Sequence, residues 1–150
     1  MLVERGAYAE AIPLLEDAVS KALPENSRPL TNLAQALLRS GNLARARSLG
    51  RLGMRRFPDE AKFCHIVAVT SAGEDVDAAA DALVQALDRD PGYRPSAALI
   101  REILQRHPAH ARFAERLRAL VADPAHARAA AVVRPLLDAP APPPSPPPAR

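Results

Sequence analysis

Two groups of residues in this chain have types and spacings that could bind a metal or serve as nucleophile and base. His107 and His110 stand three apart, a spacing that can place two imidazoles on one helix face as metal ligands. Pro108 lies between them, so the pair spans a turn, and no Asp, Glu or Cys nearby completes a site. Cys64 and His65 are adjacent in a predicted helix and point to different sides, whereas a nucleophile and its base must be in contact. We therefore expect no metal site and no cofactor.

Asp75 and Asp77 resemble a pair of catalytic carboxylates. Acids are common where a helix begins, because the positive end of the helix dipole favours them there, and these two precede a predicted helix. The chain also has no glycine loop that would bind phosphate. We assign no catalytic residues and predict that the chain is not an enzyme.

The elements that hold these residues are predicted to be helices throughout. Apolar residues recur at three- and four-residue spacing, as in Leu30, Leu33, Ala34, Leu37 and Leu38. Gly41 and Gly73 mark turns between paired helices, and Asp59 is expected to cap the helix that follows Pro58. Gly50 and Gly53 lie inside a helix at a cost of about 1 kcal/mol each, so we expect a neighbouring helix to cross closely there.

Small and apolar residues recur with a period near 34. Successive prolines stand 34 and 33 residues apart, and the matching alanines stand 35 and 33 apart. The three copies are Gly6, Tyr8, Ala11, Leu15, Ala18, Pro24; Gly41, Leu43, Ala46, Gly50, Gly53, Pro58; and Gly73, Val76, Ala79, Leu83, Ala86, Pro91. We expect Ala46 and Ala79 to be buried where the helices of a pair cross.

This pattern resembles the tetratricopeptide repeat, most closely at residues 6–12 and again over 36–58 and 59–91. The resemblance implies an all-α fold, a right-handed superhelix of stacked antiparallel helix pairs (an α-solenoid), whose concave side receives a peptide or another protein. We expect repeats over residues 1–106 and capping helices over 107–139, of which the last runs from Ala125 to about Val133. Residues 140–150 are expected to form a disordered proline-rich tail.

The register of the repeats also predicts which side chains line the concave face. The family's best-known groove holds a terminal carboxylate with lysines, but Lys21 and Lys62 do not sit where such a clamp needs them. The expected partner-binding residues are Thr31, Asn32, Gln35 and Arg39 in the second repeat, with Phe63, Val67 and Thr70 in the third.

The first repeat has only Met1 to Arg5 ahead of its glycine, so its first helix is missing, and its remaining helix is expected to begin near Tyr8. Ile12, Leu15 and Val19 form an apolar stripe that such a helix would cover. We expect this apolar stripe at the N-terminal end to become buried, either by self-association of the chain or by docking onto residues that normally precede Met1.

The composition indicates in which compartment the protein works and which classes of partner it binds. No apolar run is long enough to span a membrane, no signal pattern opens the chain, and the lone Cys64 cannot form an internal disulfide, so we expect a cytoplasmic protein with no membrane partner. Six arginines and no acid stand between Arg39 and Pro58. Nucleic-acid binding through the predicted helix from Arg45 to Arg56 is the less favoured interpretation, because no aromatic residues alternate with its arginines to stack on bases.

We therefore predict a non-catalytic protein–protein interaction module, or scaffold, that binds a protein or peptide of unknown identity. The alternative is that the chain is the repeat arm or a fragment of a larger enzyme, such as a glycosyltransferase.

Overall fold

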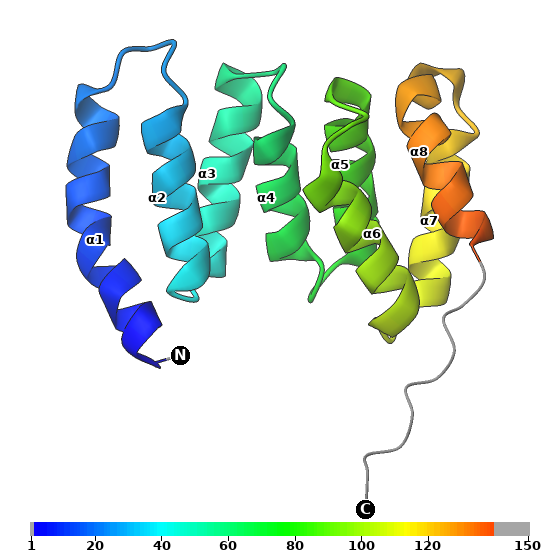
Figure 1. Cartoon of the computed structure of the whole chain (residues 1–150), viewed down its shortest axis with the longest axis horizontal. Helices are drawn as coiled ribbons and strands as arrows, with labels where there is room; N and C mark the ends of the chain where they lie inside the picture. The colour runs from blue at the N-terminus through cyan, green and yellow to red at the C-terminus, as the bar shows by residue number, and fades with distance from the viewer. Residues whose placement is uncertain (1, 140–150) are drawn as a thin grey trace, which may run out of the picture.

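The computed structural model describes residues 2–139, with side chains from Gly6 onward, and this part of the chain contains helices and no strand. Figure 1 shows the helices standing side by side along the longest axis. Their order is α1 (Leu2–Lys21), α2 (Arg28–Arg39), α3 (Leu43–Arg56), α4 (Ala61–Ser71), α5 (Val76–Arg89), α6 (Arg94–Arg106), α7 (His110–Val121), the 3-10 turn Pro124–His126, and α8 (Ala127–Asp138). The all-helical prediction is confirmed over this range, whereas the right-handed superhelical twist stays a prediction.

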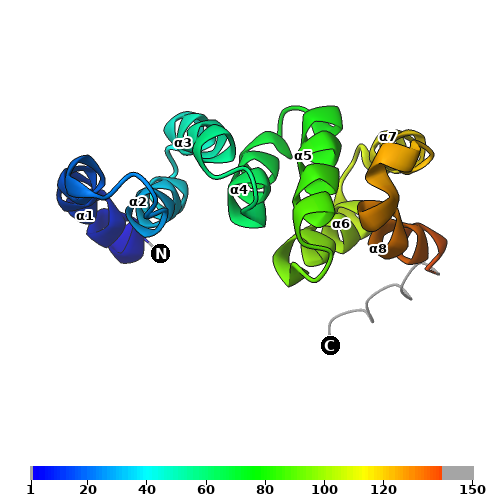
Figure 2. The ribbon, with the colours of Figure 1, turned by 90° about the horizontal axis from the view of Figure 1, so that it is seen from above.

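The helices from α2 onward alternate between two rows. Seen from above, α2, α4, α6 and α8 lie in one row and α3, α5 and α7 in the other (Figure 2). Short turns join the helices, so each runs antiparallel to the next (Figure 1). Such turns keep sequence neighbours adjacent in space, and each helix packs against the ones before and after it. The row of α2, α4 and α6 faces the viewer in Figure 1 and is called the front face below.

The predicted turns and crossings occur where the glycines and alanines indicate. Gly41, in the turn between α2 and α3, has φ of +89°, a left-handed backbone that favours glycine. The Asn42 side chain then caps α3 by accepting a hydrogen bond from the Arg45 backbone N–H at 3.3 Å. Ala46 and Ala79 are fully buried, as predicted.

Helices α3 and α4 approach each other closely. A Cβ atom built on Gly53 would lie 2.1 Å from Cδ1 of Phe63, and one built on Gly50 would lie 2.9 Å from Cγ2 of Val67. Real Cβ atoms do not approach other heavy atoms this closely, so only glycine fits at these positions. The predicted close crossing is confirmed.

Three helix boundaries differ from prediction. Helix α1 begins at Leu2 rather than near Tyr8, because Gly6 does not adopt the left-handed backbone that would interrupt it. The residue at the capping position of α4 is Glu60, not the predicted Asp59. Its carboxylate contacts Ser27 and Lys62 and makes no capping hydrogen bond to the helix. Helix α8 extends to Asp138, beyond the predicted end near Val133. The predicted disordered tail, 140–150, lies outside the described residues.

The core runs the length of the stack. Its largest cluster joins α4 to α8, where Phe113, Leu117 and Val133 are fully buried, so α7 and α8 cover the apolar faces of α5 and α6. Smaller clusters join α1, α2 and α3. There the stripe of Ile12, Leu15 and Val19 is half-buried against α2, and Leu14 beside it is 76% exposed. Self-association through this end stays a prediction.

Candidate functional site

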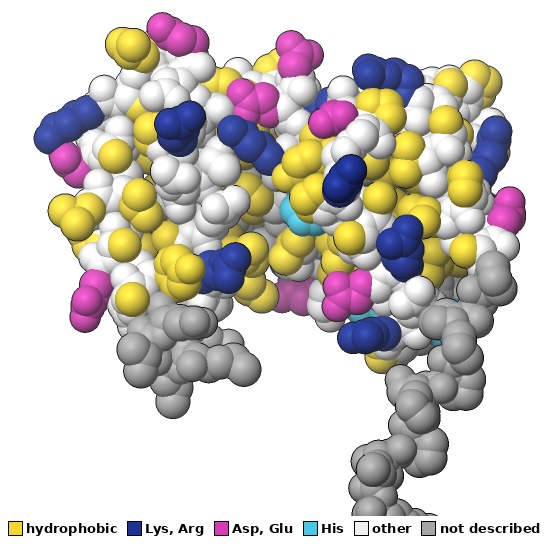
Figure 3. Space-filling model, viewed as in Figure 1, with side chains coloured by type: hydrophobic (Ala, Val, Ile, Leu, Met, Phe, Trp, Pro, Cys, Tyr) yellow, Lys and Arg dark blue, Asp and Glu magenta, His cyan; other side chains and the backbone are white. Residues whose placement is uncertain are grey.

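A shallow groove of about 220 Å³ opens between α2, α4 and the start of α6. Figure 3, which looks onto this face, shows hydrophobic side chains gathered around a histidine near the middle. The groove is lined by Gln35, Leu38 and Arg39 from α2; Lys62, His65, Ile66 and Val69 from α4; and Tyr93 and Pro95 at the start of α6. It is the place on the front face where polar and apolar side chains from three helices meet.

Helix α2 presents its polar side to this groove because its apolar side is buried in the core. Leu30, Leu33 and Leu37 are buried at helical spacing, which turns the opposite side of the helix outward. The predicted residues Asn32, Gln35 and Arg39 are exposed, and the structure brings Gln35 and Arg39 together in the groove. Thr31 is half-buried and Asn32 lies outside the groove lining; the Thr31 hydroxyl donates to the Ser27 carbonyl at 2.9 Å.

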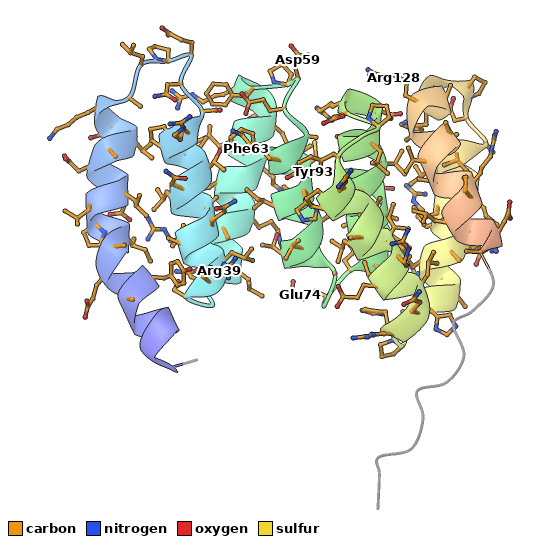
Figure 4. All side chains as sticks on the ribbon, viewed as in Figure 1. Arg39, Asp59, Phe63, Glu74, Tyr93 and Arg128 are labelled. Carbon is orange, nitrogen blue, oxygen red and sulfur yellow. The ribbon has the colours of Figure 1, made fainter. Side chains whose placement is uncertain are left out.

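Arg39 is positioned by an aromatic contact at the lower end of α2 (Figure 4). Its guanidinium carbon lies 5.9 Å from the ring centre of Tyr8 on α1. A cation over an aromatic face is attracted to it without losing its charge. The Tyr8 ring therefore helps to hold the Arg39 guanidinium beside the groove.

The prediction for α4 is wrong in register. Phe63, Val67 and Thr70 are buried and do not line an open surface: Phe63 packs against Gly53 of α3, and the Thr70 hydroxyl donates to the Ile66 carbonyl at 2.9 Å. The reason is that α4 packs between α3 and α5, which together cover most of its circumference. The half-exposed side chains of α4 are instead Lys62, His65 and Val69.

His65 is the polar centre of the groove. Its Nδ1 lies 3.1 Å from the hydroxyl oxygen of the buried Ser96, and its ring meets the edge of the Tyr93 ring with centroids 5.6 Å apart. Burial lowers the pKa of the His65 imidazole from its usual 6.5, so the ring is neutral at pH 7. Burial, followed by the nearby Asp90 carboxylate, raises the pKa of Tyr93, whose hydroxyl stays protonated. The two rings therefore present neutral surface to a ligand.

Lys62 belongs to a polar cluster that ties the start of α2 to the start of α4. Its ammonium donates to the Ser27 hydroxyl at 3.0 Å and lies 2.9 Å from a Glu60 oxygen, and the Ser27 hydroxyl donates to the other Glu60 oxygen at 2.9 Å. Burial acts to raise the pKa of Glu60, but the hydrogen bonds from Lys62 and Ser27 outweigh it and hold that pKa below its usual value. The cluster fixes the separation of the two helices that form one side of the groove.

Sequence reasoning missed seven residues of the groove lining: Leu38, Lys62, His65, Ile66, Val69, Tyr93 and Pro95. The signal for Tyr93 and Pro95 was their position directly after the Asp90-Pro91-Gly92 turn, which places them at the mouth of the next front-row helix. The signal for α4 was weak, because eight of its eleven residues are buried and no polar stripe marks its outer side.

The residues first considered for chemistry are engaged elsewhere. His107 Nε2 lies 2.8 Å from the Ala72 carbonyl, and His110 Nδ1 lies 3.0 Å from the His107 carbonyl. Cys64 is fully buried, which raises the pKa of its thiol, and Asp75 caps α5 by accepting from the backbone N–H of Asp77. Among the described residues, no three His, Cys, Asp or Glu side chains are grouped so as to hold a metal ion.

The arginine-rich helix α3 lies in the other row, away from the groove (Figure 2). Two of its arginines are used inside the fold. Arg45 pairs with Glu16 of α1, and Arg47 donates to the Thr70 carbonyl and pairs with Glu74 at 3.1 Å. These contacts fasten α3 to its neighbours, although Arg45 stays exposed, and the further exposed arginines of α3 are Arg51, Arg55 and Arg56.

Comparison with known proteins agrees with this arrangement of paired helices. Residues 2–63, which span α1, α2, α3 and the start of α4, match the sequence model of the tetratricopeptide repeat family. This match, over residues 2–63, supports a protein of the tetratricopeptide repeat family. Tetratricopeptide repeats are in general protein-interaction modules without chemistry of their own. No curated protein and no solved structure gave a significant match to the chain. Within residues 2–139, none of the helices of this repeat protein has the length and apolar character needed to cross a membrane.

Proposed function

We propose that this chain is a non-catalytic interaction module that binds a peptide segment of a partner protein in the groove between α2, α4 and α6. The observation that carries the proposal is the convergence of Gln35 and Arg39 with His65 and Tyr93 in one recess. These side chains lie on three helices, or at the start of one, whose opposite sides are buried in core clusters, so the groove is formed before a ligand arrives.

The character of the groove suits a peptide better than a small metabolite. Its volume of about 220 Å³ is below the range of about 300–1,000 Å³ that is typical of small-molecule pockets. The Gln35 amide can donate to and accept from a peptide backbone, while Val69 and the Tyr93 ring offer apolar contact area. A short segment of mixed polar and apolar residues can satisfy both kinds of contact.

In this proposal the repeats extend beyond the matched residues. The pair α4 and α5, and after it α6, continues the alternation of front-row and back-row helices that α2 and α3 establish (Figure 2). Residues 1–106 then form the binding array, and residues 107–139 close its core as a cap. The groove lies across the junction of three successive front-row helices, where such an array holds its ligands.

The test is affinity capture from the source organism with three forms of the whole chain. The groove variant is Gln35→Ala/Arg39→Ala, and the matched control is Arg51→Ala/Arg55→Ala, which changes exposed residues of α3 in the other row. We expect a partner that is captured by the wild type and by the control but lost from the groove variant. Circular dichroism establishes that all three forms are folded. If the groove variant retains every protein that the wild type captures, the proposal is wrong.

A further inference from the structure

The three helices that line the groove have an uneven distribution of charge. They carry one acidic side chain, Glu102, against six basic ones: Arg28, Arg39, Lys62, Arg94, Arg101 and Arg106. All of the arginines among these are exposed. The loops at the ends of α4 carry four acids: Glu60 pairs with Lys62, Glu74 pairs with Arg47 of α3, Asp75 caps α5, and Asp59 is exposed. The three helices themselves therefore carry an excess of positive charge.

The acids of the neighbouring back-row helix do not balance this excess. Helix α5 carries Asp77, Asp81 and Asp88, but the first two are held by arginines of α7: Arg112 lies 3.0 Å from Asp77, and Arg116 lies 2.8 Å from Asp81. Asp88 accepts from the backbone N–H of Ala129 at 3.1 Å and so fixes the start of α8. The negative charges of α5 are thus used to join the back-row and capping helices.

The basic side chains continue beyond the groove along α6. Arg101 and Arg106 line a second recess, of about 350 Å³, together with Ala98, Glu102 and Gln105. Figure 3 shows dark blue side chains spread among the hydrophobic ones over this face, with magenta acidic side chains also present. The front face therefore alternates apolar contact area with separate positive charges, over a length that exceeds a single pocket.

We propose that the segment bound on the front face is acidic, with Asp or Glu side chains interspersed among apolar residues. This inference rests on the proposed function and specifies its ligand. Arginine binds a carboxylate through two parallel N–H donors, so each exposed guanidinium can hold one acidic side chain of the partner. The neutral His65 and Tyr93 rings, with Val69 beside them, take the apolar residues between those acids.

The placement of the arginines also distinguishes this ligand from two others. They are spread over α2 and α6 rather than gathered around one point, which suits several side-chain carboxylates and not a single terminal carboxylate. A single-stranded nucleic acid is normally held by exposed aromatic rings that stack on its bases. The groove offers Tyr93, and that ring is half-buried against His65.

The experiment pans a random 12-residue peptide display library against the whole chain and counts Asp and Glu in the selected peptides against the input library. We expect at least a twofold enrichment of acidic residues with the wild type. The variant Arg39→Glu/Arg101→Glu should lose that enrichment, and the control Arg51→Glu/Arg55→Glu on α3 should retain it. A selected peptide is then synthesised with a fluorescent label, both as found and with every acid replaced by its amide. Fluorescence anisotropy should show at least tenfold weaker binding of the neutral form, and no change when the C-terminus is amidated.

Several results would overturn the inference. One is a selected set with no excess of acids; others are equal binding of the neutral form or loss of binding on C-terminal amidation. Tighter binding of a labelled 12-nucleotide single-stranded RNA, lost in Arg39→Glu/Arg101→Glu, would assign the face to nucleic acid instead. If the library yields neutral peptides that Gln35→Ala/Arg39→Ala no longer binds, the acidic specificity fails and the proposed function stands. If no selected peptide is lost from that variant, both fail.

Discussion

Replacing Gly53 with alanine tests the close crossing on which the packing of α3 and α4 depends. The added Cβ would lie 2.1, 2.3 and 2.5 Å from Cδ1, Cγ and Cε1 of Phe63. Carbon atoms in contact are normally about 3.5–4.0 Å apart. Phe63 has no room to withdraw, because its ring is fully buried and stacks on Phe57 with centroids 5.7 Å apart. Either the ring leaves its rotamer or the two helices move apart.

Two opposing terms set the magnitude. Alanine is favoured over glycine inside a helix by about 1 kcal/mol, which would stabilise the variant. Overpacking a buried site costs about 1–3 kcal/mol, and three contacts with a fixed ring place this substitution at the upper end. The net effect is a loss of about 2 kcal/mol. For a domain of this size that corresponds to a fall of about 4–8 °C in Tm.

The assay is urea unfolding followed by circular dichroism at 222 nm, with the free energy of unfolding taken from the midpoint and slope. Adding Phe63→Leu, which removes ring atoms from the clash, should reduce the cost of Gly53→Ala by at least about 1 kcal/mol, the coupling expected of residues in contact. A Gly53→Ala variant that unfolds at higher urea than the wild type would show that propensity alone acts there. The crossing described above would then be wrong.

Three further substitutions test other features by the same unfolding assay. Gly41→Ala should cost about 1–2 kcal/mol, because φ of +89° is strained for any residue with a Cβ. Gly73→Ala is the matched control, since Gly73 has no positive φ and an added Cβ there would meet nothing within 4 Å. Equal losses of stability at both sites would contradict this account. Ala46→Leu should cost about 1–3 kcal/mol by overpacking the fully buried crossing of α2 and α3, and an unchanged midpoint would refute the repeat register. His65 has a folded-state pKa below its unfolded value of about 6.5, so the stability that it contributes is present above pH 6.5 and is lost as pH falls through the folded-state pKa. The His65→Asn variant should therefore lose less stability than the wild type between pH 7.5 and 5.5. Identical losses would mean that the protonation of His65 is not linked to folding.

The repeat period and the small residues at the crossings could be read from the sequence alone. Turn glycines such as Gly41, and the burial of Ala46 and Ala79, follow from local rules. A left-handed turn requires glycine, and an alanine in a helical apolar stripe is buried wherever its helix meets another. These features depend on neighbours within one helix pair, so a single pattern of residues is enough to specify them. The same rules placed the polar side of α2, including Gln35 and Arg39, on the surface.

The outer side of α4 was decided by the tertiary structure. Eight of its eleven residues are buried, so the helix is apolar nearly all round and its sequence marks no polar face. Only the packing of α3 and α5 against it settles that Lys62, His65 and Val69 remain half-exposed while Phe63, Val67 and Thr70 are covered. The groove likewise joins residues from Gln35 to Pro95, and the Ser27–Glu60 contact beside it spans 33 positions. Contacts over such separations depend on how the helix pairs stack, which the periodicity within each pair does not specify.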